Sequence, residues 1–62
     1  MTEAEQMKMM IRGAAVEHGV DAEFNESLEQ LRQMVIAAKE KGEKHEAGLY
    51  MAFGYIGAEI QQ

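Results

Sequence analysis

The chain has 62 residues, of which 29 are apolar, with 11 acidic and six basic side chains and a net charge of −5 at pH 7. This charge argues against direct binding of nucleic acid, because a phosphate backbone selects clustered lysine and arginine. Fifteen of the apolar residues are Ala or Met, and there is no Cys to form a disulfide. A single small domain over residues 1–62 with so few bulky side chains is marginally stable alone. The composition therefore predicts self-association.

Neither a targeting segment nor a membrane span is visible in the sequence. The chain opens with the acidic run MTEAE, whereas a secretory signal peptide opens with basic residues. The longest uncharged run, residues 47–58, has 12 residues, and a membrane-spanning helix needs about 20. We expect a soluble cytoplasmic protein that does not contact a membrane.

The first predicted helix covers about residues 3–18. Thr2 and Glu5 have the spacing of a capping box, and Gly19 stands where a left-handed residue ends a helix. Between them, one helical stripe recurs at steps of three or four residues: Ala4, Met7, Ile11, Ala14 and His18. Gly13 weakens this helix by roughly 1 kcal/mol relative to Ala.

The second predicted helix covers about residues 22–41. Asp21 is a suitable N-cap, and Glu23 would lie in the first turn, where the helix dipole favours an acid. The strongest local signal in the chain is an apolar seam with the 4–3 spacing of a coiled coil: Phe24, Leu28, Leu31, Val35 and Ala38.

Residues 39–46 read KEKGEKHE and admit two interpretations. Gly42 can end the second helix and start a short turn. Alternatively, the 4–3 spacing continues through Gly42, His45 and Leu49, which would give one helix over about 21–60. The glycine within a charged stretch favours the turn, and the poor N-capping of Glu43 and Lys44 favours the long helix.

The third predicted helix covers about residues 45–60. One stripe consists of Leu49, Phe53, Ile56 and Ile60, and small residues on the other faces make the helix apolar nearly all round. Its three glycines cost roughly 3 kcal/mol of helix propensity, which is tolerable if they permit close backbone approach. Alternation over residues 49–55 is the pattern of a strand, but no second strand is available to pair with it.

These elements predict an all-α fold of three helices, in which an N-terminal helix precedes a helical hairpin and the chain forms a homodimer. In the hairpin, the seam of the second helix would pack against Leu49, Phe53 and Ile56. The remaining apolar surface would be buried across a two-fold axis. The predicted dimer or partner surface consists of Met7, Met10, Ile11, Leu49, Phe53, Ile56 and Ile60.

No pattern in the sequence indicates catalysis, a cofactor or a metal. His18 and His45 titrate near neutrality, but they lack the i, i+4 partner of a metal-binding pair. Thr2 and Ser27 are typical of helix starts rather than of nucleophiles. We expect a protein that is not an enzyme.

An acidic patch is predicted around the junction of the first two helices, formed by Glu17, Asp21, Glu23, Glu26 and Glu29. One interpretation is a solvated face that keeps the protein in solution. The other is a surface for a protein partner with a basic surface, including mimicry of a phosphate backbone.

In general character the whole chain resembles a known group of proteins. The opening MTEAEQMKMMIRGAAVEHG and the closing LYMAFGYIGAEI are similar to the small accessory proteins of the exo–xis early region of lambdoid phages. The resemblance rests on no catalytic or binding motif. It implies a dispensable phage protein in the host cytoplasm that alters regulation through protein contacts.

Two functions follow as hypotheses. The first is a non-catalytic, homodimeric interaction protein, a phage-type accessory regulator that acts by binding another protein. The second is an acidic nucleic-acid mimic that inhibits a DNA-binding protein.

Overall fold

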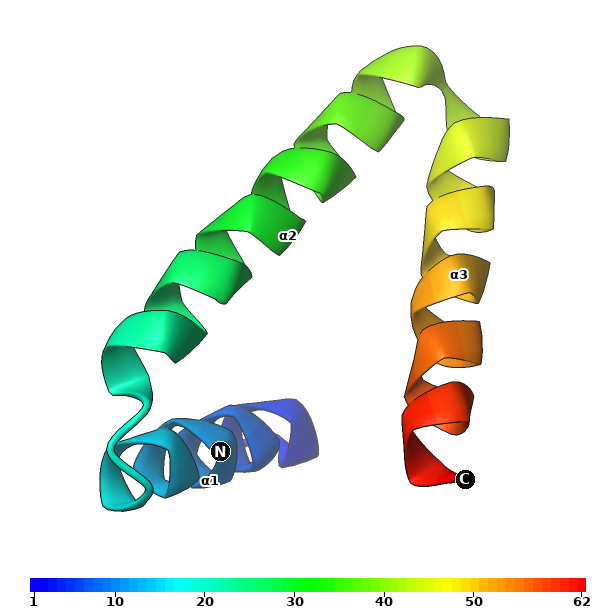
Figure 1. Cartoon of the computed structure of the whole chain (residues 1–62). Helices are drawn as coiled ribbons and strands as arrows, with labels where there is room; N and C mark the ends of the chain where they lie inside the picture. The colour runs from blue at the N-terminus through cyan, green and yellow to red at the C-terminus, as the bar shows by residue number, and fades with distance from the viewer.

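A computed structural model describes all 62 residues, and it contains three helices and no strand (Figure 1). The helices are α1 (Glu3–Glu17), α2 (Asp21–Lys41) and α3 (Glu43–Gln61). The all-α fold class and the three predicted helices are confirmed. The strand alternative for residues 49–55 is wrong, because this stretch lies within α3.

The start of α1 is capped as the sequence predicts. Thr2 is the N-cap, and its side-chain oxygen accepts a hydrogen bond of 3.2 Å from the backbone N–H of Glu5. The Glu5 carboxylate in turn accepts a bond of 3.1 Å from the Thr2 hydroxyl, rather than from the Thr2 backbone as in a full capping box. One of the unpaired backbone donors at this helix end is thereby satisfied.

The junction between α1 and α2 is a Schellman motif built on Gly19. Gly19 has φ +71°, and its N–H bonds to the carbonyl of Val16 while that of Val20 bonds to the carbonyl of Ala15. The predicted helix-ending glycine is confirmed. The predicted N-cap is wrong, because Val20 occupies that position without a side-chain cap and Asp21 is already the first helical residue. This tight motif leaves no residue free between the helix end and the next helix.

Gly42 alone separates α2 from α3. Its φ of +117° and ψ of 175° lie in a region that only glycine occupies readily. The predicted turn is confirmed, and the alternative of one continuous helix is wrong. α3 begins at Glu43, two residues earlier than predicted, because the Gly42 carbonyl already accepts the N–H of Glu46 at 3.1 Å.

The three helices form an open arrangement in which α2 is central (Figure 1). α2 contacts both other helices, whereas α1 and α3 do not contact each other. The radius of gyration is 13.6 Å, compared with about 10.6 Å for a compact chain of this length. Only Ala15 and Ala38 are buried, so the chain by itself has almost no core.

The predicted packing of the α2 seam is correct only near the helix ends. Phe24 and Val35 are half-buried on α2, as are Leu49 and Phe53 on α3. Leu31 in the middle of the seam and Ile56 on α3 remain exposed, because α3 diverges from α2 with distance from Gly42 (Figure 1). The hairpin of the sequence prediction is therefore splayed rather than closed.

Candidate interaction surface

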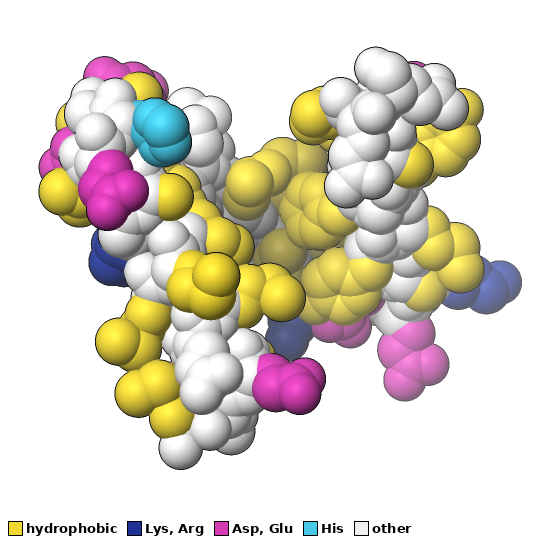
Figure 2. Space-filling view, turned by 90° about the horizontal axis from the view of Figure 1, so that it is seen from below, with side chains coloured by type: hydrophobic (Ala, Val, Ile, Leu, Met, Phe, Trp, Pro, Cys, Tyr) yellow, Lys and Arg dark blue, Asp and Glu magenta, His cyan; other side chains and the backbone are white.

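The most prominent surface feature is a hollow between the helices, which we call the central groove. Figure 2 looks into it from below, with α1 on one side, α3 on the other and apolar side chains along both walls. Leu31 and Val35 lie on its α2 side, and the stripe Leu49, Phe53, Ile56 and Ile60 follows one face of α3. The groove thus gathers apolar side chains that are distant in sequence.

Exposure along the α3 stripe increases with distance from Gly42. Leu49 and Phe53 are half-buried, Ile56 is 52% exposed and Ile60 is 78% exposed. One continuous apolar face therefore begins as an intramolecular contact and continues without a partner. Large apolar side chains in such a contiguous arrangement mark an interaction site more often than singly exposed ones do.

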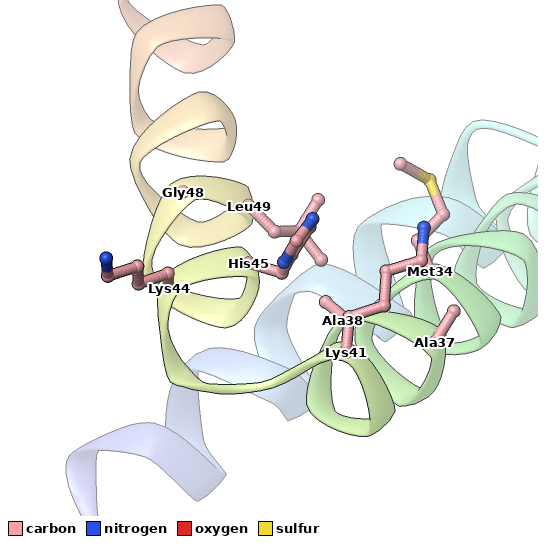
Figure 3. A pocket seen from close by; sticks show the side chains of 8 residues that line it. All are labelled: Met34, Ala37, Ala38, Lys41, Lys44, His45, Gly48 and Leu49. Carbon is pink, nitrogen blue, oxygen red and sulfur yellow. The ribbon is translucent and has the colours of Figure 1, made fainter.

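The closed end of the groove is an open pocket of about 540 Å³ beside the turn at Gly42. Figure 3 shows His45 and Leu49 projecting from α3 toward α2, whereas Lys44 points away. Met34 and Ala38 contribute the α2 side of the lining. The mixed lining of apolar and basic groups contains no carboxylate, and no group positioned as a nucleophile.

Glu46 holds α2 and α3 together on the polar side of the turn. Its Oε2 lies 3.6 Å from Nζ of Lys39 and accepts a hydrogen bond of 3.0 Å from the hydroxyl of Tyr50. This hydrogen bond is the largest cause that raises the pKa of Tyr50 above its ordinary value of 10.0. Partial burial and the charge of Glu46 act in the same direction, and Lys39 opposes them.

Arg12 makes the corresponding link between α1 and α2. Its guanidinium donates a hydrogen bond of 3.2 Å to the side-chain oxygen of Asn25 and lies 5.5 Å from the centroid of the Phe24 ring, within the range of a cation–π contact. Ile11 lies beside it in a small pocket against Phe24 and Leu28. This link places α1 at the far end of α2 from Gly42.

The residues of the predicted partner surface do not form one patch within the chain. Ile11 contacts the α1–α2 pocket, and Leu49 and Phe53 are half-buried. The other four are exposed, on two helices that do not touch: Met7, Met10, Ile56 and Ile60. The structure places these two groups on opposite sides of the central groove.

Sequence reasoning missed both of the polar links between helices. Tyr50 follows Glu46 by four residues, a spacing that brings side chains together on one helix face, so this pair was available as a signal. The pairs Lys39–Glu46 and Arg12–Phe24 join different helices. Their contact depends on the two turns and has no signal in a linear pattern.

Comparison with known proteins identifies the family. A model for a family of unknown function, DUF8536, matches residues 1–62. The chain belongs to DUF8536. No curated protein and no solved structure is significantly similar to it.

The acidic side chains of this DUF8536 member are exposed around the α1–α2 junction. At 100° per residue, Asp21, Glu29, Glu26 and Glu23 are distributed over about 200° of the circumference of α2. Glu29 lies 4.0 Å from Arg32, a surface pair of little energetic value. The acids therefore surround the helix rather than forming a single row.

Two further searches of the DUF8536 chain concern membranes and metals. None of its helices combines the length and the apolar character needed to cross a membrane. No group of three or more His, Asp or Glu side chains is close enough to hold a metal ion. His18 and His45 lie in different parts of the fold, at the first junction and at the second.

Proposed function

We propose that the chain is a non-catalytic interaction protein that acts by binding other polypeptides, and that its first partner is a second copy of itself. The observation that carries the proposal is the exposed surface. The chain exposes 5532 Å², whereas a compact monomer of its mass exposes about 4,000 Å². Each chain thus leaves about 1,500 Å² more surface in water than a folded monomer of this size does.

This excess has the size of a stable interface. For two chains it amounts to roughly 3,000 Å², within the range of obligate homodimers. Much of it is apolar, because the exposed large side chains include Met7, Met10, Ile56 and Ile60. Burial of such side chains contributes about 1.5–3 kcal/mol each.

The glycines of α3 support the same proposal. A Cβ atom added at Gly48, Gly54 or Gly57 would meet nothing within 4 Å, so the close backbone approach expected from the sequence does not occur within one chain. A second chain would supply it. Without such an approach, these three residues only weaken the helix.

The resemblance to lambdoid phage accessory proteins, which rests on sequence character alone, suggests the setting for this activity. In that setting the homodimer would act in the cytoplasm of an infected host, as a regulator that binds a host or phage protein. The binding surface would then be whatever apolar surface the dimer leaves exposed.

The solution mass tests the proposal. Light scattering after size exclusion, over a hundredfold range of concentration, should give twice the chain mass. Ile56→Asp should give the monomer mass, since a charge on the α3 stripe cannot be buried without a partner. Met51→Asp is the matched control: Met51 is 75% exposed and lies on the opposite face of α3, so this variant should remain a dimer. A wild-type monomer at all concentrations would refute the proposal.

A further inference from the structure

The apolar surface of α2 between residues 24 and 39 is bordered by basic residues and by no acid. Two adjoining pockets, of about 400 and 230 Å³, share Leu28 and Arg32. Their combined lining consists of six apolar residues and four basic ones, the latter being Lys8, Arg12, Arg32 and Lys39. We call this continuous surface the basic-edged trough.

The trough concentrates charge against the character of the chain. Four of the six basic residues line it, although the net charge is −5. The acids of α2 lie elsewhere, since Glu23 and Glu26 point to the other side of the helix at 100° per residue. An apolar floor with a basic edge is complementary to an amphipathic helix that carries an acid beside its apolar stripe.

We infer that the basic-edged trough receives the C-terminal half of α3 from a second copy of the chain. This segment presents Ile56 and Ile60 as an exposed apolar stripe. Beyond Glu46 its sole charged side chain is Glu59, which flanks the stripe next to Ile56 on the helix. Both the apolar and the acidic requirements of the trough are thus met by one segment of the chain itself.

The exchange would be reciprocal, because a two-fold dimer uses the same surfaces on both chains. Each α3 would enter the central groove of the other copy, between its α1 and its α3. The uncovered part of the seam, where Leu31 is 44% exposed, would then be buried beneath the partner's Ile60. This inference rests on the proposed function and specifies which surfaces meet.

Disulfide trapping tests this arrangement, because the chain contains no Cys. A mixture of Leu31→Cys and Ile60→Cys chains should form the mixed disulfide faster than a mixture of Leu31→Cys and Met51→Cys chains. Since each chain carries one thiol, every disulfide joins two copies. Preferential linkage through Met51, on the opposite face of α3, would overturn the inference while leaving the dimer intact.

A charge reversal tests the electrostatic part. Glu59→Lys would place a cation against the basic edge, and we expect the dissociation constant of the dimer to rise roughly tenfold, since like charges across an interface are costly. Glu26→Lys, the same charge change outside the trough, should leave it unchanged. Equal effects of the two variants would overturn the inference. A monomeric wild type would instead refute the proposed function, so the two failures are distinguishable.

Discussion

Lys39 Nζ lies 3.6 Å from Oε2 of Glu46, and this is the one ion pair that joins two helices of the chain. It spans the turn at Gly42, and the same carboxylate oxygen accepts the Tyr50 hydroxyl. A surface ion pair of this kind contributes less than about 1 kcal/mol. Its role is to fix the direction in which α3 leaves the turn, and hence the width of the central groove.

The Tyr50–Glu46 hydrogen bond predicts a pH dependence at the alkaline end. The pKa of Tyr50 is raised by folding, so its contribution to stability is fully present below the unfolded pKa and is lost as pH rises through the folded pKa. The melting temperature should therefore decrease above about pH 10. Tyr50→Phe should lose this component when the two melting curves are compared across pH.

The cause of the shift is also open to measurement. In a Tyr55→Phe background, tyrosinate absorbance reports Tyr50 alone. Glu46→Ala should lower the pKa of Tyr50 toward 10.0, since the largest cause of the shift is removed. Glu43→Ala, which removes an acid from the same helix, is the control and should have no effect. An unchanged pKa in Glu46→Ala would show that the hydrogen bond does not form in solution.

The backbone at Gly42 predicts opposite effects of two Gly→Ala substitutions. Gly42→Ala should destabilise the fold by about 1–3 kcal/mol, because φ +117° with ψ 175° is strained for any residue with a Cβ. Gly13→Ala should stabilise it by about 1 kcal/mol, since Gly13 is helical with open space around it. Urea unfolding followed by circular dichroism measures both. A Gly42→Ala chain as stable as the wild type would indicate that α2 and α3 have merged into one helix.

The contacts of Arg12 predict a local rather than a global effect. Arg12→Ala removes the hydrogen bond to Asn25 and the contact with the Phe24 ring, each worth about 0.5–1 kcal/mol at an exposed site. Hydrogen exchange should therefore become faster in α1 while that of α3 is unchanged. Lys44→Ala is the control, since Lys44 points away from the other helices (Figure 3). Uniformly faster exchange in all three helices would contradict the prediction.

The acidic residues of α2 predict tolerance of charge reversal. The triple variant Glu23→Lys, Glu26→Lys and Glu29→Lys should keep its helical content and its mass in solution, because these side chains are exposed and outside the trough. Only the first-turn acid, Glu23, carries a helix-dipole contribution, of about 0.3–1 kcal/mol. Loss of binding to a basic partner, with the fold retained, would instead favour the nucleic-acid mimic.

Local signals in the sequence were sufficient for the secondary structure. Thr2 and Glu5 marked the start of α1, and Gly19 and Gly42 marked the two junctions, because capping and left-handed backbone depend on residues a few positions apart. Asp21 was misplaced by one residue, since the Schellman bond of Val20 belongs to the preceding helix.

The angle between α2 and α3 was not accessible in the same way. Apolar spacing indicates which face of a helix avoids water, but not how far apart two such faces lie. Ile56 was therefore assigned to the hairpin core although it is exposed. The spacing of Leu31 and Ile56 identifies them as residues that require burial, and the structure shows that one chain does not provide it.

The restriction of contacts to neighbouring helices has a consequence for the order of events during folding. Each helix and each turn is completed by residues close in the sequence, and α1 and α3 do not meet. Chains with such local contacts fold in microseconds to milliseconds. The encounter of two copies is then the slowest step, and the rate at which the native assembly reappears after dilution from denaturant rises with protein concentration.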